Sequence, residues 1–109
     1  MIKVTGFLDG QNVKGNSEIN FSMTFPEGEL ANALQFVAAI GKRLKMIAFV
    51  NGNEDLKYNL GVFSIDNMKI DKNANCKVKF KSSVDQSFVG NFSKLLVEEA
   101  SILLKCKIM

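Results

Sequence analysis

Histidine and tryptophan are absent from this sequence of 109 residues, and proline occurs only once. The lack of histidine removes the commonest general base and the commonest metal ligand of proteins. Cys76 and Cys106 fall on the apolar sides of predicted strands, where a thiol is buried and unreactive. The acidic residues are scattered, and no two of them form a pair suited to acid–base catalysis or metal binding. We therefore expect no catalytic residue, no cofactor site and no metal site, and we expect that the protein is not an enzyme.

Two loops resemble ligand-binding motifs, but each lacks something that the motif requires. Residues 10–17 approach a phosphate-binding P-loop, yet Asn16 stands in place of its lysine and a strand pattern follows instead of a helix. Residues 71–75 approach the first half of a calcium-binding loop, yet Cys76 replaces its glycine. The sequence predicts a plain loop at the first position and a turn at the second.

Long apolar runs are missing too, since none reaches the ~20 residues that span a bilayer. The first residues alternate between polar and apolar, unlike the continuous apolar segment of a signal peptide. These features favour a cytoplasmic protein with reduced thiols and no membrane partner. Arg43 is the only arginine, whereas lysine, asparagine and isoleucine are abundant. Such a composition is typical of AT-rich genomes, including those of low-GC bacteria and their phages.

The composition favours a single domain over residues 1–109. Hydrophobic residues make up 47% of the chain and charged residues 23%, which is enough apolar surface for one core. The net charge of +3 permits an acidic partner, although dedicated nucleic-acid-binding domains usually concentrate more positive charge.

A long amphipathic helix is predicted over residues 24–44. Thr24 and Glu27 have the spacing of a capping box, with Pro26 in the first turn. The stripe predicted to face the core repeats at helical spacing and is widened by two alanines. It comprises Leu30, Leu34, Val37, Gly41 and Leu44, with Ala33 and Ala38 beside them.

Alternation between apolar and polar residues predicts strands on both sides of this helix. Gly61, inside one of them, indicates a bulge or a close approach of the helix. Asn91 can cap a short second helix over residues 92–100, and a further short strand around Phe88 is left open. The predicted strands cover residues 2–8, 19–25, 45–50, 57–65, 68–70, 76–81 and 101–108.

The predicted order of elements is ββ-α-ββββ-α-β, in which hairpins and meanders connect neighbouring strands. This order predicts an α+β fold with a mainly antiparallel sheet and both helices on one face. The first two strands are expected to pair across a loop over residues 9–17, and residues 66–67 are expected to form a turn.

Lysines alternate with apolar residues on two predicted strands, so that each strand presents its lysines on one face. Lysines two positions apart are ~6.6 Å apart, and five of them would form a compact basic patch if the two strands were neighbours. Such a patch could follow the phosphate backbone of a nucleic acid. A solvated sheet face, or edge lysines that prevent aggregation, explains the same pattern. The candidate residues are Lys77, Lys79, Lys81, Lys105 and Lys107, with Lys69 and Lys72 nearby in sequence.

Several large apolar residues fall outside the predicted core faces. They indicate a subunit or partner interface, unless helices cover both faces of the sheet or the predicted faces are shifted by one residue. These candidate interface residues are Phe7, Phe36, Ile40, Phe63 and Leu103.

Three functions fit these features. The first is a small non-catalytic interaction protein that forms a homo-oligomer and binds or blocks another macromolecule, as a phage or mobile-element accessory protein would. The second is a nucleic-acid-binding module that uses the lysine-rich sheet face. The third is a protein that sequesters a small ligand in a pocket at a subunit junction.

Overall fold

An antiparallel sheet dominates the computed structural model, which describes residues 1–6, 8–14, 18–50, 55, 57–83 and 102–109, with the backbone alone for 8–14, 18 and 83. In these ranges seven strands lie in the order β1-β7-β4-β5-β6-β3-β2, and every neighbouring pair is antiparallel. The prediction of a mainly antiparallel sheet with one main helix is confirmed. The predicted second helix over 92–100 and the short strand near Phe88 lie outside the described residues. The strands are β1 (Ile2–Gly6), β2 (Leu8–Lys14), β3 (Glu18–Phe25), β4 (Arg43–Val50), β5 (Lys57–Ile70), β6 (Cys76–Ser83) and β7 (Ile102–Ile108).

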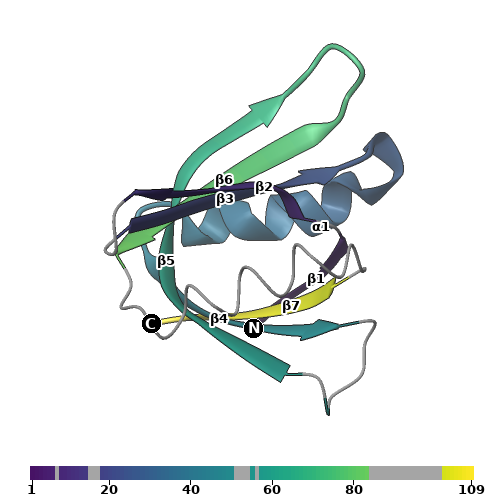
Figure 1. The fold of residues 1–109 in the computed structure, drawn as a ribbon. Helices are drawn as coiled ribbons and strands as arrows, with labels where there is room; N and C mark the ends of the chain where they lie inside the picture. Colours follow the sequence, from purple (N-terminus) through teal and green to yellow (C-terminus); the bar gives the residue numbers. More distant parts are fainter. Residues whose placement is uncertain (7, 15–17, 51–54, 56, 84–101) are drawn as a thin grey trace.

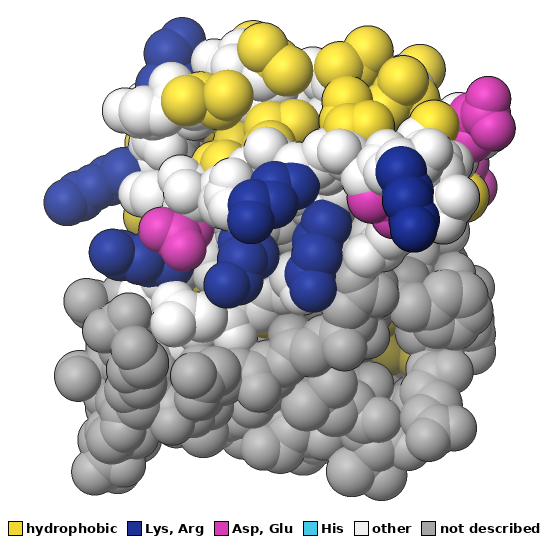
Figure 2. Space-filling model, turned by 90° about the horizontal axis from the view of Figure 1, so that it is seen from above, with side chains coloured by type: hydrophobic (Ala, Val, Ile, Leu, Met, Phe, Trp, Pro, Cys, Tyr) yellow, Lys and Arg dark blue, Asp and Glu magenta, His cyan; other side chains and the backbone are white. Residues whose placement is uncertain are grey.

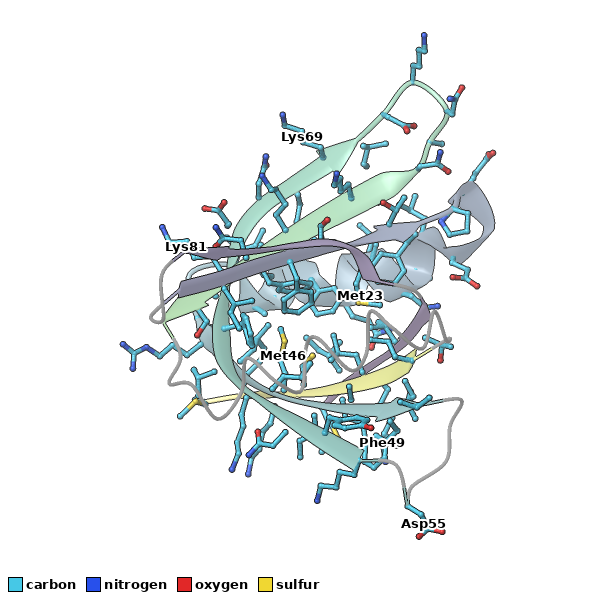
Figure 3. All side chains as sticks on the ribbon, viewed as in Figure 1. Met23, Met46, Phe49, Asp55, Lys69 and Lys81 are labelled. Atoms are coloured by element: carbon cyan, nitrogen blue, oxygen red, sulfur yellow. The ribbon has the colours of Figure 1, made fainter. Side chains whose placement is uncertain are left out.

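The sheet bends at β5 into two facing layers (Figure 1). The 14 residues of β5 belong to both layers, because the first half of this strand pairs with β4 and the second half with β6. In this view β4, β7 and β1 form the lower layer, and β6, β3 and β2 form the upper layer. Met23 and Met46, one from each layer, point into the space between the layers (Figure 3), and both are fully buried.

Three local predictions about the strands are wrong. The predicted loop over 9–17 contains β2, which pairs with β3; glycine and asparagine are poor strand formers, but an edge strand needs a partner on only one side. The strand at the start of the chain was expected to pair with 19–25, whereas β1 pairs with β7, a long-range contact that no local pattern encodes. The chain does not turn at 66–67, because β5 continues through a bulge at Asp66.

Gly61 lies at a bulge, which is one of the two roles predicted for it. Its φ is +93°, and the register with β4 skips Leu60 at this point. The extra residue reverses the alternation of side chains along β5. Phe63 therefore lies on the same inner face as Leu60 and is 1% exposed. The predicted placement of Phe63 on the opposite face is wrong for this reason.

The helical segment is shorter than predicted and runs over residues 27–39. It comprises η1 (Glu27–Glu29), α1 (Leu30–Leu34) and η2 (Gln35–Ala39). It starts after Pro26 without a side-chain cap, because Thr24 belongs to β3. It ends before Gly41, whose φ of +80° is the left-handed conformation that stops helices. The segment contacts β6, β3 and β1 through α1.

The buried side chains of this segment recur at every third position. Ala33, Phe36 and Ala39 are each 0% exposed, and this spacing matches the three residues per turn of a 3₁₀ helix. The stripe predicted from a period of 3.6 is therefore right at Ala33, which is buried, and wrong at Leu34, Val37 and Ala38, which are exposed. Leu34 and Val37, which belong to that stripe, are each 51% exposed.

Aromatic rings fill the centre of the core. Phe80 of β6 stacks on Phe21 with ring centroids 4.9 Å apart, and it meets Phe36 edge-on at 5.2 Å. Phe21 also contacts Phe63 edge-on at 4.9 Å. Phe36 and Phe63 thus belong to the same core, so neither is surplus apolar surface.

Candidate functional site

Strand β6 presents lysines on the outer face of the upper layer. The apolar residues of β6 are buried, as predicted, and the lysines between them are exposed. The four lysines that gather here, termed the β6 lysine row, are Lys69, Lys77, Lys79 and Lys81. Lys69 and Lys81 point away from the lower layer (Figure 3). Figure 2 shows basic side chains gathered across the middle of the face seen from above.

An amide group flanks the β6 lysine row. The register places Asn67 of β5 beside Lys79, whereas Ser22 of β3, on the other side of Lys79, is only 7% exposed. A surface hollow of about 170 Å³ is lined by Asn67, Lys69, Lys77 and Lys79. Amide groups and lysines are among the groups that contact phosphate oxygens in nucleic-acid complexes.

Arg43 extends the basic surface where the sheet bends. The register places Ser64 of β5 between Arg43 of β4 and Lys81 of β6. These three residues, with Val62 and Ser82, line a second hollow of about 320 Å³. The Ser82 hydroxyl donates a hydrogen bond to the backbone carbonyl of Val62. A guanidinium and an ammonium group on either side of a hydroxyl suit an anionic group such as a phosphate.

Lys105 and Lys107 do not join this row. β4 and β5 lie between β7 and β6 in the sheet, so the condition for one patch of five lysines is not met. Instead Lys3 lies opposite Lys105, and Lys45 lies opposite Lys107. These four residues form a β7 lysine group on the lower layer. The Nζ atom of Lys105 is 4.8 Å from the centre of the Phe49 ring, which is a cation–π contact.

Lysines directly oppose lysines at three places in the described part of the sheet. Like charges in such cross-strand pairs repel and destabilise the pairing of the strands. A sheet face that only needs solvation can place neutral polar residues there, as β5 does with Ser64 opposite Lys81. The lysine pairs therefore favour a use for concentrated positive charge. They are Lys69–Lys77, Lys3–Lys105 and Lys45–Lys107.

The five candidate interface residues are not brought together. Phe36 and Phe63 are in the core, Leu103 is half-buried on β7, and Phe7 lies outside the described residues. Ile40, at the end of the helical segment, is 55% exposed.

The helical segment carries an exposed apolar row that was not predicted from the sequence. Leu34, Val37 and Ile40 are each at least half exposed and are spaced by three residues. The sequence does carry a signal for this row. Ala33 and Phe36 are also spaced by three residues, and with a period of three such a series lies on one face of the helix while Leu34, Val37 and Ile40 lie on another.

The described residues offer little of the chemistry that catalysis uses. No group of three or more His, Cys, Asp or Glu side chains among them could hold a metal ion. Both cysteines are free and buried. Burial raises the pKa of the Cys76 thiol and raises the pKa of Cys106 to about 12. A thiol with a raised pKa is a poor nucleophile at neutral pH.

Residues 71–75 form the predicted turn, between β5 and β6. The Asp71 carboxylate accepts hydrogen bonds from the backbone N–H groups of Asn75, at 3.0 Å, and Asn73, at 2.8 Å. These bonds, the one from Asn75 foremost, lower the pKa of Asp71. The Asp71 carboxylate thus stabilises the turn through these hydrogen bonds.

Among the described residues, no helix combines the length and the apolar character that a membrane span requires. Comparison of the chain with known proteins finds no family model and no curated protein that matches it.

Proposed function

We propose that the protein is a non-catalytic binding protein whose β6 lysine row contacts the phosphate backbone of a nucleic acid. The observation that carries this proposal is the direct pairing of Lys69 with Lys77 on neighbouring strands. Two ammonium groups in this arrangement repel each other. A phosphate between them would replace the repulsion by two attractive contacts. Arg43 would extend the same surface beyond Lys81, across the hollow that both residues line.

The side chains around the row favour contact with phosphates over contact with bases. Phe80, beneath the row, is 0% exposed, and the exposed large apolar side chains of the described residues include no aromatic ring. Bases therefore find no exposed ring on which to stack there. Contacts through the backbone alone carry no direct sequence information, so we expect binding that is independent of base sequence.

The number of phosphate contacts sets the salt dependence of binding. Since the sheet bends at β5 (Figure 1), the β6 lysine row and the β7 lysine group lie on opposite outer faces. A straight duplex would contact one of them at a time. Four contacts predict a slope of about −3.6 for log K against log salt concentration, and a fifth, from Arg43, predicts about −4.5.

Titration of a labelled mixed-sequence DNA duplex, followed by fluorescence anisotropy at several salt concentrations, tests the proposal. Lys79→Glu, in the middle of the row, is expected to abolish binding. Lys77→Gln is expected to reduce the magnitude of the slope by about 0.9, the contribution of one phosphate contact. Lys57→Glu is the matched control, because it changes the net charge equally and Lys57 lies opposite Phe49, away from the row.

Three outcomes would refute the proposal. The first is no binding to the duplex at low salt. The second is an equal loss of affinity in Lys57→Glu and Lys79→Glu, which would mean that net charge alone matters. The third is displacement of the duplex by polyglutamate as effectively as by unlabelled duplex, which would point to an acidic protein partner.

A further inference from the structure

The exposed row on the helical segment changes from small to large side chains along its length. Every third residue belongs to it, and all five of these residues are exposed. The last three are exposed by 51%, 51% and 55%. The row is narrow near the start of the segment and bulky near its end. In chain order it consists of Gly28, Ala31, Leu34, Val37 and Ile40.

Charges of opposite sign lie at the two ends of this row. Glu27 and Glu29 are in the first turn of the segment, whereas Lys42 and Arg43 follow its end, and all four are exposed. Figure 2 shows hydrophobic side chains along one edge of the molecule, with a basic side chain beyond one end and an acidic one beyond the other. A second copy of the row in the reverse direction would bring unlike charges together at both ends.

The geometry points to a second copy of this chain as the partner of the row, with the two helical segments antiparallel about a two-fold axis. In one alignment Leu34 of each copy faces Val37 of the other, and Ala31 faces Ile40. Each bulky end then meets a narrow end. A parallel alignment would instead place Ile40 against Ile40 and leave a gap between the two small ends.

The same alignment pairs charges. It places Glu29 opposite Lys42, and the contact occurs twice because a two-fold interface repeats every contact. In a parallel alignment each charged residue would oppose its own copy and repel it. This surface is on a different element from the β6 lysine row, so the inference does not depend on nucleic-acid binding.

The dimer is expected to be weak. Three side chains that are about half exposed can bury far less surface area than the ~800 Å² per partner of a standard interface. We therefore expect monomers at low concentration and dimers at high concentration.

Sedimentation equilibrium over a series of concentrations is the first test. The mass is expected to rise from 12.1 kDa toward twice that value. Val37→Asp places a charge in the middle of the row and is expected to hold the protein at the monomer mass. Ala38→Asp is the matched control, because Ala38 is also exposed but lies outside the row, and this variant is expected to associate like the wild type.

Exchange of the paired charges tests the alignment itself. Glu29→Lys and Lys42→Glu each put two repulsive contacts into their own dimer, and at the strength of exposed ion pairs this weakens association roughly tenfold. An equimolar mixture restores both attractive contacts and is expected to associate at least as well as the wild type. Each variant keeps a net positive charge, because one reversal changes the value of +3 by two units, so overall attraction between unlike proteins cannot explain a recovery.

The inference is overturned if the wild type keeps the monomer mass at every concentration. It is also overturned if Val37→Asp associates as Ala38→Asp does, or if the mixture of charge variants associates no better than either variant alone.

Discussion

Exchange of Lys77 for glutamate is expected to stabilise the fold while it weakens binding. Lys77 lies directly opposite Lys69, and the Cβ atoms of such a pair are ~5 Å apart. Two ammonium groups on flexible stems at ~7 Å repel each other by about 0.6 kcal/mol in water. Because Lys77→Glu replaces this repulsion by an attraction of similar size, we expect the free energy of unfolding to rise by about 0.5–1 kcal/mol.

Urea denaturation measures this change. The midpoint is expected to rise without a change in the slope, and the gain is expected to shrink near ~1 M salt, where the screening length is ~3 Å. A double-mutant cycle isolates the pair. Lys69→Glu is expected to stabilise the protein as Lys77→Glu does, and the double variant is expected to lose the gain, because two carboxylates then face each other. Lys57→Glu again serves as the control for net charge.

Two results would contradict this reasoning. If Lys77→Glu is no more stable than the wild type, or if the two single effects simply add in the double variant, the two side chains do not interact as the register implies. If Lys77→Glu is stabilised but binds the duplex as the wild type does, the lysine pair has no role in binding.

Three further predictions concern the fold. Phe80→Ala removes a ring that contacts two others and is expected to lower the free energy of unfolding by about 3–5 kcal/mol. Phe80→Leu is expected to lower it by less than about 1.5 kcal/mol. Equal losses for the two variants in urea denaturation would contradict this prediction. Gly61→Ala puts a side chain at a φ of +93° and is expected to cost about 1–2 kcal/mol, whereas Gly28→Ala, with nothing within 4 Å of the added atom, is expected not to destabilise. Burial raises the pKa of Cys106 from 9.0 to about 12, so its contribution to stability is complete below pH 9 and falls by about 1.4 kcal/mol per pH unit above it. Cys106→Ala is expected to lack this loss, and an identical fall in both proteins would show that the thiol is not responsible.

The strands with a clear alternation could be predicted from the sequence, because a period of two is visible within a few residues. β6 is the best example, since its lysines are exposed and its apolar residues are buried, as expected. The partner of each strand could not be predicted in the same way. The patch of five lysines depended on contact between β6 and β7, and two strands separate them.

The buried face of the helical segment could not be predicted, because the prediction assumed the 3.6-residue period of an α-helix. Spacings of three and four both fit the apolar residues of 27–39, and only packing selects the spacing of three that buries Ala33 in α1 and Phe36 and Ala39 in the 3₁₀ helix η2. The bulge at Gly61 was anticipated as one alternative. Its effect on Phe63 was not, because a single extra residue inverts every assignment after it.

The central position of β7 in the lower layer has a consequence for biosynthesis. β7 lies between β1 and β4, and it pairs Ile2 with Cys106 across almost the whole sequence. A ribosome therefore synthesises β1 and β4 well before β7, the strand that lies between them. Until then the apolar side chains of β1 and β4 cannot pack in the completed sheet. Contacts so distant in sequence are slow to form. Completion of the sheet accordingly waits for residues 102–108, and a nascent chain that stalls before residue 102 would lack the pairing of β7 with both β1 and β4.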